Sequence, residues 1–128
     1  MLTINDYFDQ IYCINLKRRP DRWLRAKKQF DILGLTVKQF EAIDGQMLSK
    51  LPKRLQRVRR EESIPGAVGC YLSHRAIIQD AYDNNYKKIL VMEDDVDFVP
   101  NANKLFGSHI HEVPVDWHML YLNVYHKT

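Results

Sequence analysis

Apolar residues gather in four short runs along the chain, and polar segments with helical spacing separate them. The runs cover residues 9–16, 35–40, 88–92 and 117–125, and their length and their content of Ile, Val and Tyr predict strands. The third run is the most apolar and is β-branched near its centre, so we expect it in the middle of a sheet.

Helical spacing fills the gaps between these runs. From Trp23 to Leu33, apolar residues recur every three or four positions, with Pro20 suited to the first turn and Gly34 to the C-cap. A second helix is predicted from Pro65 to about Asn85, and a weaker one over residues 101–112.

The segment between the second strand and the second helix is irregular. Asp44-Gly45 predicts a turn, a short helical turn is expected before Pro52, and residues 53–65 read as a loop. Residues 50–60 carry six cations, although the net charge of the chain is only +3. We interpret them as a solvated basic loop, with a cationic rim for phosphate or an anionic acceptor as the alternative. The segment lacks interleaved aromatic residues, so nucleic acid is not an expected partner.

Strands alternate with helices, which predicts an α/β fold with a mostly parallel sheet flanked by helices. The 128 residues fit one domain over residues 1–128. No helix follows the last strand, so we expect a fold incomplete at its C-terminal side. Tyr121 and Tyr125 on that uncovered strand would then form an interface, for example in a homo-oligomer.

Composition narrows the class of protein. Hydrophobic residues make up 45% and charged residues 27%, as in ordinary globular proteins. No apolar stretch reaches the length of a membrane span, and the N-terminus has no secretory pattern, so a cytoplasmic location is expected. Cys13 and Cys70 are expected to be small buried hydrophobes with free thiols.

Three polar clusters fall at predicted strand ends: residues 15–18, Asp44-Gly45 and Glu93-Asp94-Asp95. Ligands of parallel sheets bind beyond the carboxyl ends of the strands, so the three clusters indicate one site.

The acidic triplet is the strongest chemical signal. Three adjacent carboxylates repel one another, and a hard divalent cation such as Mn²⁺ or Mg²⁺ relieves the repulsion. Alternation along an extended chain points Glu93 and Asp95 to the same side, as metal ligands, and turns Asp94 elsewhere, for example toward a ribose hydroxyl. The simpler alternative is an acidic turn or helix cap in solvent. Asp97 is expected to be a turn residue.

The histidines divide into two groups. His109, His111 and His118 are expected to be solvated, because an H-x-H pair on a helix does not share one face. His74 lies in the first turns of a predicted helix, where it could meet a phosphate or a sugar.

Taken together, these segments resemble glycosyltransferase family 25, which includes bacterial lipopolysaccharide sugar transferases and animal procollagen galactosyltransferases. Residues 14–22 look like the family's I-N-L-x-R-x-x-D-R pattern, and residues 42–45 are similar to its A-x-D-G. Residues 66–75 resemble its G-x-x-G-C-x-L-S-H block, and residues 93–95 its downstream E-D-D. His118 departs from the family's D-W-D pattern.

The resemblance implies a GT-A-like, Rossmann-like fold and inverting transfer of a sugar, such as galactose or glucose, from a nucleotide sugar to an acceptor hydroxyl. The donor would be a UDP-sugar, and the acceptor a glycan, lipopolysaccharide or protein. It makes Asp95 and Glu93 the ligands of Mn²⁺ or Mg²⁺, and Glu93, Asp94, Asp95 and His74 the catalytic group. Its nucleotide-sugar site comprises Asn15, Leu16, Arg18, Arg22, Asp44, Gly45, Ser73 and Asp94.

Two other readings remain open. A transferase-like domain that binds a nucleotide sugar or a partner protein without catalysis would share these motifs. A Mg²⁺-dependent phosphotransfer or receiver-type domain also carries acids at strand ends, but Asn123 and Lys127 match poorly the acid and lysine that it needs at later strands.

Overall fold

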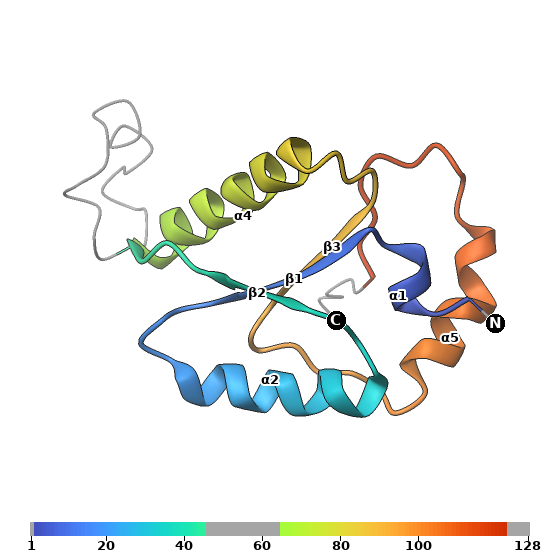
Figure 1. Cartoon of the computed structure of the whole chain (residues 1–128), viewed down its shortest axis with the longest axis horizontal. Helices are drawn as coiled ribbons and strands as arrows, with labels where there is room; N and C mark the ends of the chain where they lie inside the picture. Colours follow the sequence, from blue (N-terminus) through green and yellow to red (C-terminus); the bar gives the residue numbers. More distant parts are fainter. Residues whose placement is uncertain (1, 46–64, 123–128) are drawn as a thin grey trace, which may run out of the picture.

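The computed structural model describes residues 2–45 and 65–122 and has an α/β architecture (Figure 1). Its elements are α1 (Ile4–Tyr7), β1 (Gln10–Asn15), α2 (Pro20–Leu33), β2 (Lys38–Glu41), α4 (Pro65–Asp83), β3 (Ile89–Glu93), α5 (Ala102–His109) and the 3-10 helix η2 (Ile110–Glu112). The three described strands are all parallel and lie in the order β2-β1-β3. The predicted α/β fold class is confirmed, and the small open sheet is consistent with a Rossmann-like GT-A fold.

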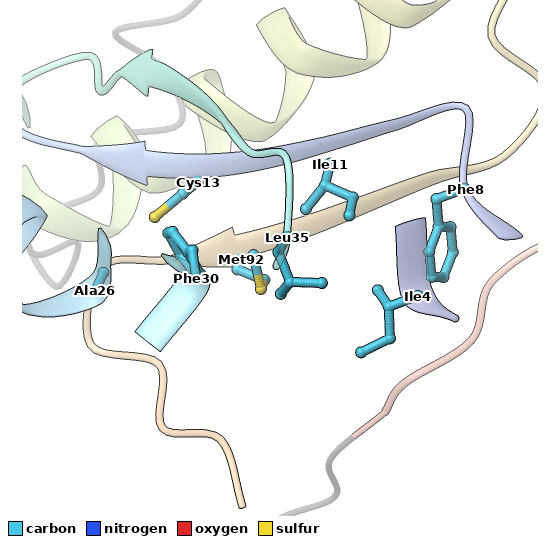
Figure 2. Close-up of a cluster of buried hydrophobic side chains, with 8 residues drawn as sticks. All are labelled: Ile4, Phe8, Ile11, Cys13, Ala26, Phe30, Leu35 and Met92. Atoms are coloured by element: carbon cyan, nitrogen blue, oxygen red, sulfur yellow. The ribbon is translucent and has the colours of Figure 1, made fainter. Parts of the chain in front are cut away.

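Helices cover both faces of the sheet (Figure 1). Alternation along β1 sends Ile11 and Cys13 to one face, where they pack with Phe30 of α2, and Tyr12 and Ile14 to the other, where they pack with Ile77 of α4. Figure 2 shows the larger of these two clusters, with side chains from α1, α2 and the strands. The continuous apolar run of the first strand therefore reflects burial on both faces.

The order of the strands corrects one prediction. We expected the third apolar run at the centre of the sheet, but among the three described strands β3 lies at an edge and β1 is the central one. From Ile11 to Asn15 every residue of β1 is buried, whereas in β3 only Met92 is. Tyr12 explains why the more polar strand can be central, because its hydroxyl donates a hydrogen bond of 2.6 Å to Asp80 at the margin of the core.

The local start and stop signals act as predicted for α2. Pro20 occupies its first turn, and Gly34 closes it with φ at 66°, a left-handed conformation that favours glycine. The short α1 was not predicted. Its signal is a capping box, in which the Thr3 hydroxyl accepts from the Asp6 N–H and the Asp6 carboxylate accepts from the Thr3 N–H.

The predicted fourth strand is wrong over residues 117–122, which form no strand; residues 123–125 lie outside the described part. Trp117 contacts another part of the fold: its indole N–H donates to the Tyr7 hydroxyl at 2.8 Å, and its ring packs against the core cluster that includes residues of α1. Met119 and Tyr121 are exposed. Tyr121 is exposed but does not lie on a strand, and Tyr125 lies outside the described residues, so the expected interface stays a prediction.

The predicted turn before Pro52 and almost all of the predicted loop, with its basic residues, lie outside the described part of the chain. None of the helices described is long and apolar enough to cross a membrane.

Candidate functional site

The carboxyl edge of the sheet brings the three polar clusters together. In the parallel register Asn15 at the end of β1 pairs with Glu41 at the end of β2, and Ile14 pairs with Glu93 at the end of β3. The predicted convergence on one edge is therefore confirmed, although the strands alone do not determine where the side chains point.

Asn15 is the centre of a buried polar network. Its side-chain amide donates to Asp94 Oδ2 at 2.8 Å and to the Arg19 carbonyl at 3.0 Å, while its oxygen accepts from Gln39 Nε2 at 3.1 Å. Asp94 is only 7% exposed, and its other oxygen lies 3.6 Å from Arg22 Nη1. Asn15 therefore joins the end of β1 to the acidic triplet, and Asp94 orients Arg22.

Arg18 and Asp44 connect the first and second clusters. Arg18 Nε lies 3.2 Å from Asp44 Oδ2, and both side chains line an open pocket of about 300 Å³. Leu16 lines the same pocket, as does Lys17, which lies in the predicted cluster of residues 15–18. Glu41 and Ala42 also line it, and neither was assigned to the site from the sequence. The signal that could have found them is the A-x-D-G block, which begins at Ala42 and directly follows Glu41.

The N-terminal half of α4 is fastened to the second cluster. The Ser73 hydroxyl accepts from the Ile43 N–H at 2.9 Å and donates to the Gly69 carbonyl at 2.7 Å. A Cβ atom at Gly69 would lie 2.8 Å from the Gly45 nitrogen and even closer to the Ile43 carbonyl oxygen. The glycine and the serine of this block thus permit and hold a close approach of two backbones.

The two cysteines differ from each other. Cys13 is fully buried, as expected, and burial raises the pKa of its thiol to about 12. Cys70 is only partly buried, which corrects the prediction of a buried hydrophobe. Its thiol donates to Glu93 Oε1 at 2.9 Å, and burial, together with this hydrogen bond, raises the pKa of the thiol to about 11.

His74 lies one helical turn after Cys70 and faces the same carboxylate, with its Nε2 3.8 Å from Glu93 Oε1. The ligand atoms of Cys70, His74 and Glu93 all lie within 4.8 Å of one another. Within residues 2–45 and 65–122, no other group of three such side chains brings its ligand atoms this close.

The acidic triplet therefore separates into three environments. Glu93 faces α4, Asp94 turns away from its neighbours as predicted but is buried on Asn15, and Asp95 is exposed with no hydrogen bond or ion pair to the described residues. The expected pairing of Glu93 and Asp95 on one side is not seen, because Glu93 contacts the side chains of α4. The other histidines agree with expectation, since His109, His111 and His118 are exposed. Asp97 is exposed and forms an ion pair with Arg25.

Comparisons with known proteins identify the family. A family model described as glycosyltransferase family 25 (LPS biosynthesis protein) matches residues 8–128. A glycosyltransferase 25 family member from Anopheles gambiae is 38% identical over 70% of this chain and 17% of its own length. Procollagen galactosyltransferase 2 from Homo sapiens is 32% identical over 90% of this chain and 20% of its own length.

A relative from Bos taurus, described as probable inactive glycosyltransferase 25 family member 3, is 29% identical over 90% of this chain and 22% of its own length. The chain thus spans about a fifth of the length of the curated relatives it matches. No solved structure gives a significant match. The family match and the relatives agree with the four motif segments at the carboxyl edge, and the chain belongs to glycosyltransferase family 25.

Proposed function

We propose that this chain carries the donor-binding part of a metal-dependent glycosyltransferase that moves a sugar from a nucleotide sugar to an acceptor hydroxyl with inversion. One observation carries the proposal: side-chain hydrogen bonds connect all four motif segments, residues 14–22, 42–45, 66–75 and 93–95, at the carboxyl edge. These bonds are Asn15–Asp94, Arg18–Asp44 and Ile43–Ser73. Four segments that are distant in sequence thus form one continuous surface.

The donor's diphosphate is assigned to the arginine side of this edge. Arg18 and Arg22 are both about half exposed, and guanidinium groups bind phosphate oxygens in a two-pronged manner. In the described structure each pairs with a carboxylate, Asp44 or Asp94, which holds the side chain at the edge. The nucleoside is assigned to the pocket of about 300 Å³ beside Leu16 and Asp44.

The residues fit a hard cation at Asp95. Its carboxylate is exposed, and carboxylate oxygens together with water and phosphate are the ligands that Mn²⁺ and Mg²⁺ take. Glu93 is the second candidate ligand, but its Oε1 already accepts from Cys70. When bound, the cation neutralises the charge that grows on the departing nucleoside diphosphate.

The names of the relatives suggest the first compounds to test. The Homo sapiens relative is described as a procollagen galactosyltransferase and the family as a lipopolysaccharide biosynthesis family. UDP-galactose is therefore the first donor to test and UDP-glucose the second, with glycan or protein acceptors.

The test is calorimetric titration of each UDP-sugar, with and without Mn²⁺. We expect binding that Mn²⁺ strengthens, and loss of this Mn²⁺ effect in Asp95→Asn. The matched control is Asp97→Asn, another exposed carboxylate two residues further on, which should bind as the unaltered chain does. If neither UDP-sugar binds with or without Mn²⁺, the proposal is wrong.

A non-catalytic donor-binding domain is the second candidate, favoured by the description of the Bos taurus relative as probably inactive. It predicts the same titration result without release of UDP, whereas the transferase predicts slow hydrolysis or transfer of the sugar. The receiver-type alternative has no support, because the family match covers residues 8–128.

A further inference from the structure

The side chains of Cys70, His74 and Glu93 bring a thiol, an imidazole and a carboxylate together at the carboxyl edge of the sheet. Cys70 and His74 are four residues apart on α4, so the helix presents them on one face. Glu93, the last residue of β3, reaches them from the sheet. Two of the three groups are thus placed by a helix and one by a strand end, and sites on such elements are held more precisely than sites on loops.

We propose that Cys70, His74 and Glu93 form a zinc site, separate from the hard-cation position at Asp95. The proposal goes beyond the proposed function, because it concerns a different ion and needs no nucleotide. It gives His74 and Glu93 a common task, and it leaves Asp95 as the carboxylate for Mn²⁺.

Two of the three distances between donor atoms are close to those that tetrahedral zinc requires, and the third, between Cys70 and His74, is at most 4.8 Å. Zn–S and Zn–N or Zn–O bonds of about 2.3 and 2.0–2.1 Å place tetrahedral ligand atoms roughly 3.3–3.6 Å apart. Here the Cys70 Sγ lies 2.9 Å and the His74 Nε2 3.8 Å from Glu93 Oε1. The sulfur–oxygen pair must open by about half an ångström when the metal replaces the thiol proton, and the nitrogen must approach by a similar amount.

The kind of donor selects the ion. Thiolate and imidazole favour Zn²⁺ over Mn²⁺ and Mg²⁺, which prefer sets made only of oxygen ligands. Three protein ligands leave a fourth tetrahedral position for water. That position can be reached from solvent, because 43% of the His74 side chain and 48% of the Glu93 side chain are exposed.

The position of the cluster indicates what the ion would do. Ser73 lies between Cys70 and His74, and its hydroxyl accepts a hydrogen bond from the Ile43 N–H at the carboxyl edge of the sheet. A zinc ion bound by Cys70, His74 and Glu93 would fasten α4 to the end of β3. It would thereby hold residues 66–75 and 93–95 at a constant separation.

The experiment uses Co²⁺ as a spectroscopic probe for zinc, on the full chain with reduced thiols and no nucleotide. Co²⁺ bound by a thiolate gives a charge-transfer band in the near ultraviolet, and tetrahedral Co²⁺ gives strong visible bands. We expect both sets of bands to saturate at one equivalent and to disappear when one equivalent of Zn²⁺ is added. Excess Mn²⁺ should leave them unchanged.

Variants identify the ligands. Cys70→Ser should remove the charge-transfer band although Cys13 is still present, and Asp95→Asn should keep it. His74→Gln, at a partly exposed position, should weaken Zn²⁺ affinity by about tenfold or more. Removing even a residue that only hydrogen-bonds to a metal ligand typically weakens metal affinity by about this much. Circular dichroism checks that each variant is folded.

The proposal is overturned if the unaltered chain gives no thiolate band, a result that does not depend on any variant. It is equally overturned if the band persists in Cys70→Ser, if Mn²⁺ displaces Co²⁺, or if Asp95→Asn abolishes the band. Failure of UDP-sugar binding would leave all of these results unaffected, so the two proposals fail separately.

Discussion

Replacing Gly69 by alanine tests the close approach of α4 to the backbone of residues 43–45. The added methyl carbon would lie 2.8 Å from the Gly45 nitrogen and against the Ile43 carbonyl oxygen, and both neighbours are backbone atoms. Neither can move aside as a flexible side chain would. The helix must therefore shift away from residues 43–45, and the 2.9 Å hydrogen bond from the Ile43 N–H to Ser73 must lengthen or break.

The magnitude follows from three opposing effects. Alanine is favoured over glycine inside a helix by about 1 kcal/mol. Overpacking costs about 1–3 kcal/mol, and loss of the Ile43–Ser73 hydrogen bond about 1 kcal/mol more. We therefore expect Gly69→Ala to lower the free energy of unfolding by about 1–3 kcal/mol.

The assay is urea unfolding followed by circular dichroism, with Tyr82→Ala as a control on the same helix. Tyr82 is 79% exposed, so its replacement should change the free energy of unfolding by no more than about 0.5 kcal/mol. If the added methyl group met no backbone atom, only the higher helix propensity of alanine would act, and the free energy of unfolding would rise. A Gly69→Ala chain more stable than the unaltered one by about 1 kcal/mol would mean that the two backbones are not in contact, which would refute the reasoning.

Further predictions concern the buried polar groups. Asn15→Ala removes the amide that donates to buried Asp94, and should lower the free energy of unfolding in urea by about 3 kcal/mol, while Asn84→Ala at an exposed position should cost much less. Tyr12→Phe should cost about 1–2 kcal/mol at neutral pH by the same assay, because it removes the hydrogen bond to Asp80. That hydrogen bond lowers the pKa of Asp80 below 3.8 in the folded chain. Its contribution is therefore complete well above pH 3.8 and is lost as the pH falls through the lower folded-state pKa, so the difference between Tyr12→Phe and the unaltered chain should shrink in acid. If the difference in the free energy of unfolding between the two chains stayed constant down to a pH of about 2, the contribution of Tyr12 would not depend on the ionisation of Asp80, and the prediction would be wrong.

Local signals in the sequence predicted the elements well where one residue type has one structural use. Pro20 and Gly34 bound α2 because the ring of proline fits the first turn and glycine accepts a positive φ. The family motifs likewise predicted which segments meet, since parallel strands place their carboxyl ends at one edge.

What could not be predicted depends on contacts between distant residues. β1 is central among the described strands, and the hydroxyl of its buried Tyr12 finds a partner in Asp80, which is 68 residues away. Trp117, where a strand was predicted, instead donates a hydrogen bond to Tyr7, 110 residues earlier, and residues 117–122 form no strand. The local pattern of apolar residues indicates neither Asp80 as the partner of Tyr12 nor Tyr7 as the partner of Trp117. For residues 117–125 that pattern alone is typical of a strand.

The acidic triplet illustrates the same limit within a single motif. Alternation along a strand predicted that Asp94 turns away from its neighbours, and its bond to Asn15 agrees. It did not predict that Glu93 faces a thiol and an imidazole, because those groups arrive on α4. Consecutive carboxylates repel one another least when each has its own counterpart. Asp94 contacts the amide of Asn15 and the guanidinium of Arg22, and Glu93 contacts the thiol and the imidazole of α4. Asp95 is exposed to solvent and has no hydrogen bond or ion pair to the described residues. Of the three, Asp95 is therefore the residue whose charge a divalent cation would neutralise with no existing contact to break. For this reason Asp95→Asn, rather than Glu93→Gln, is the substitution that tests the proposed donor metal separately from the contacts of α4.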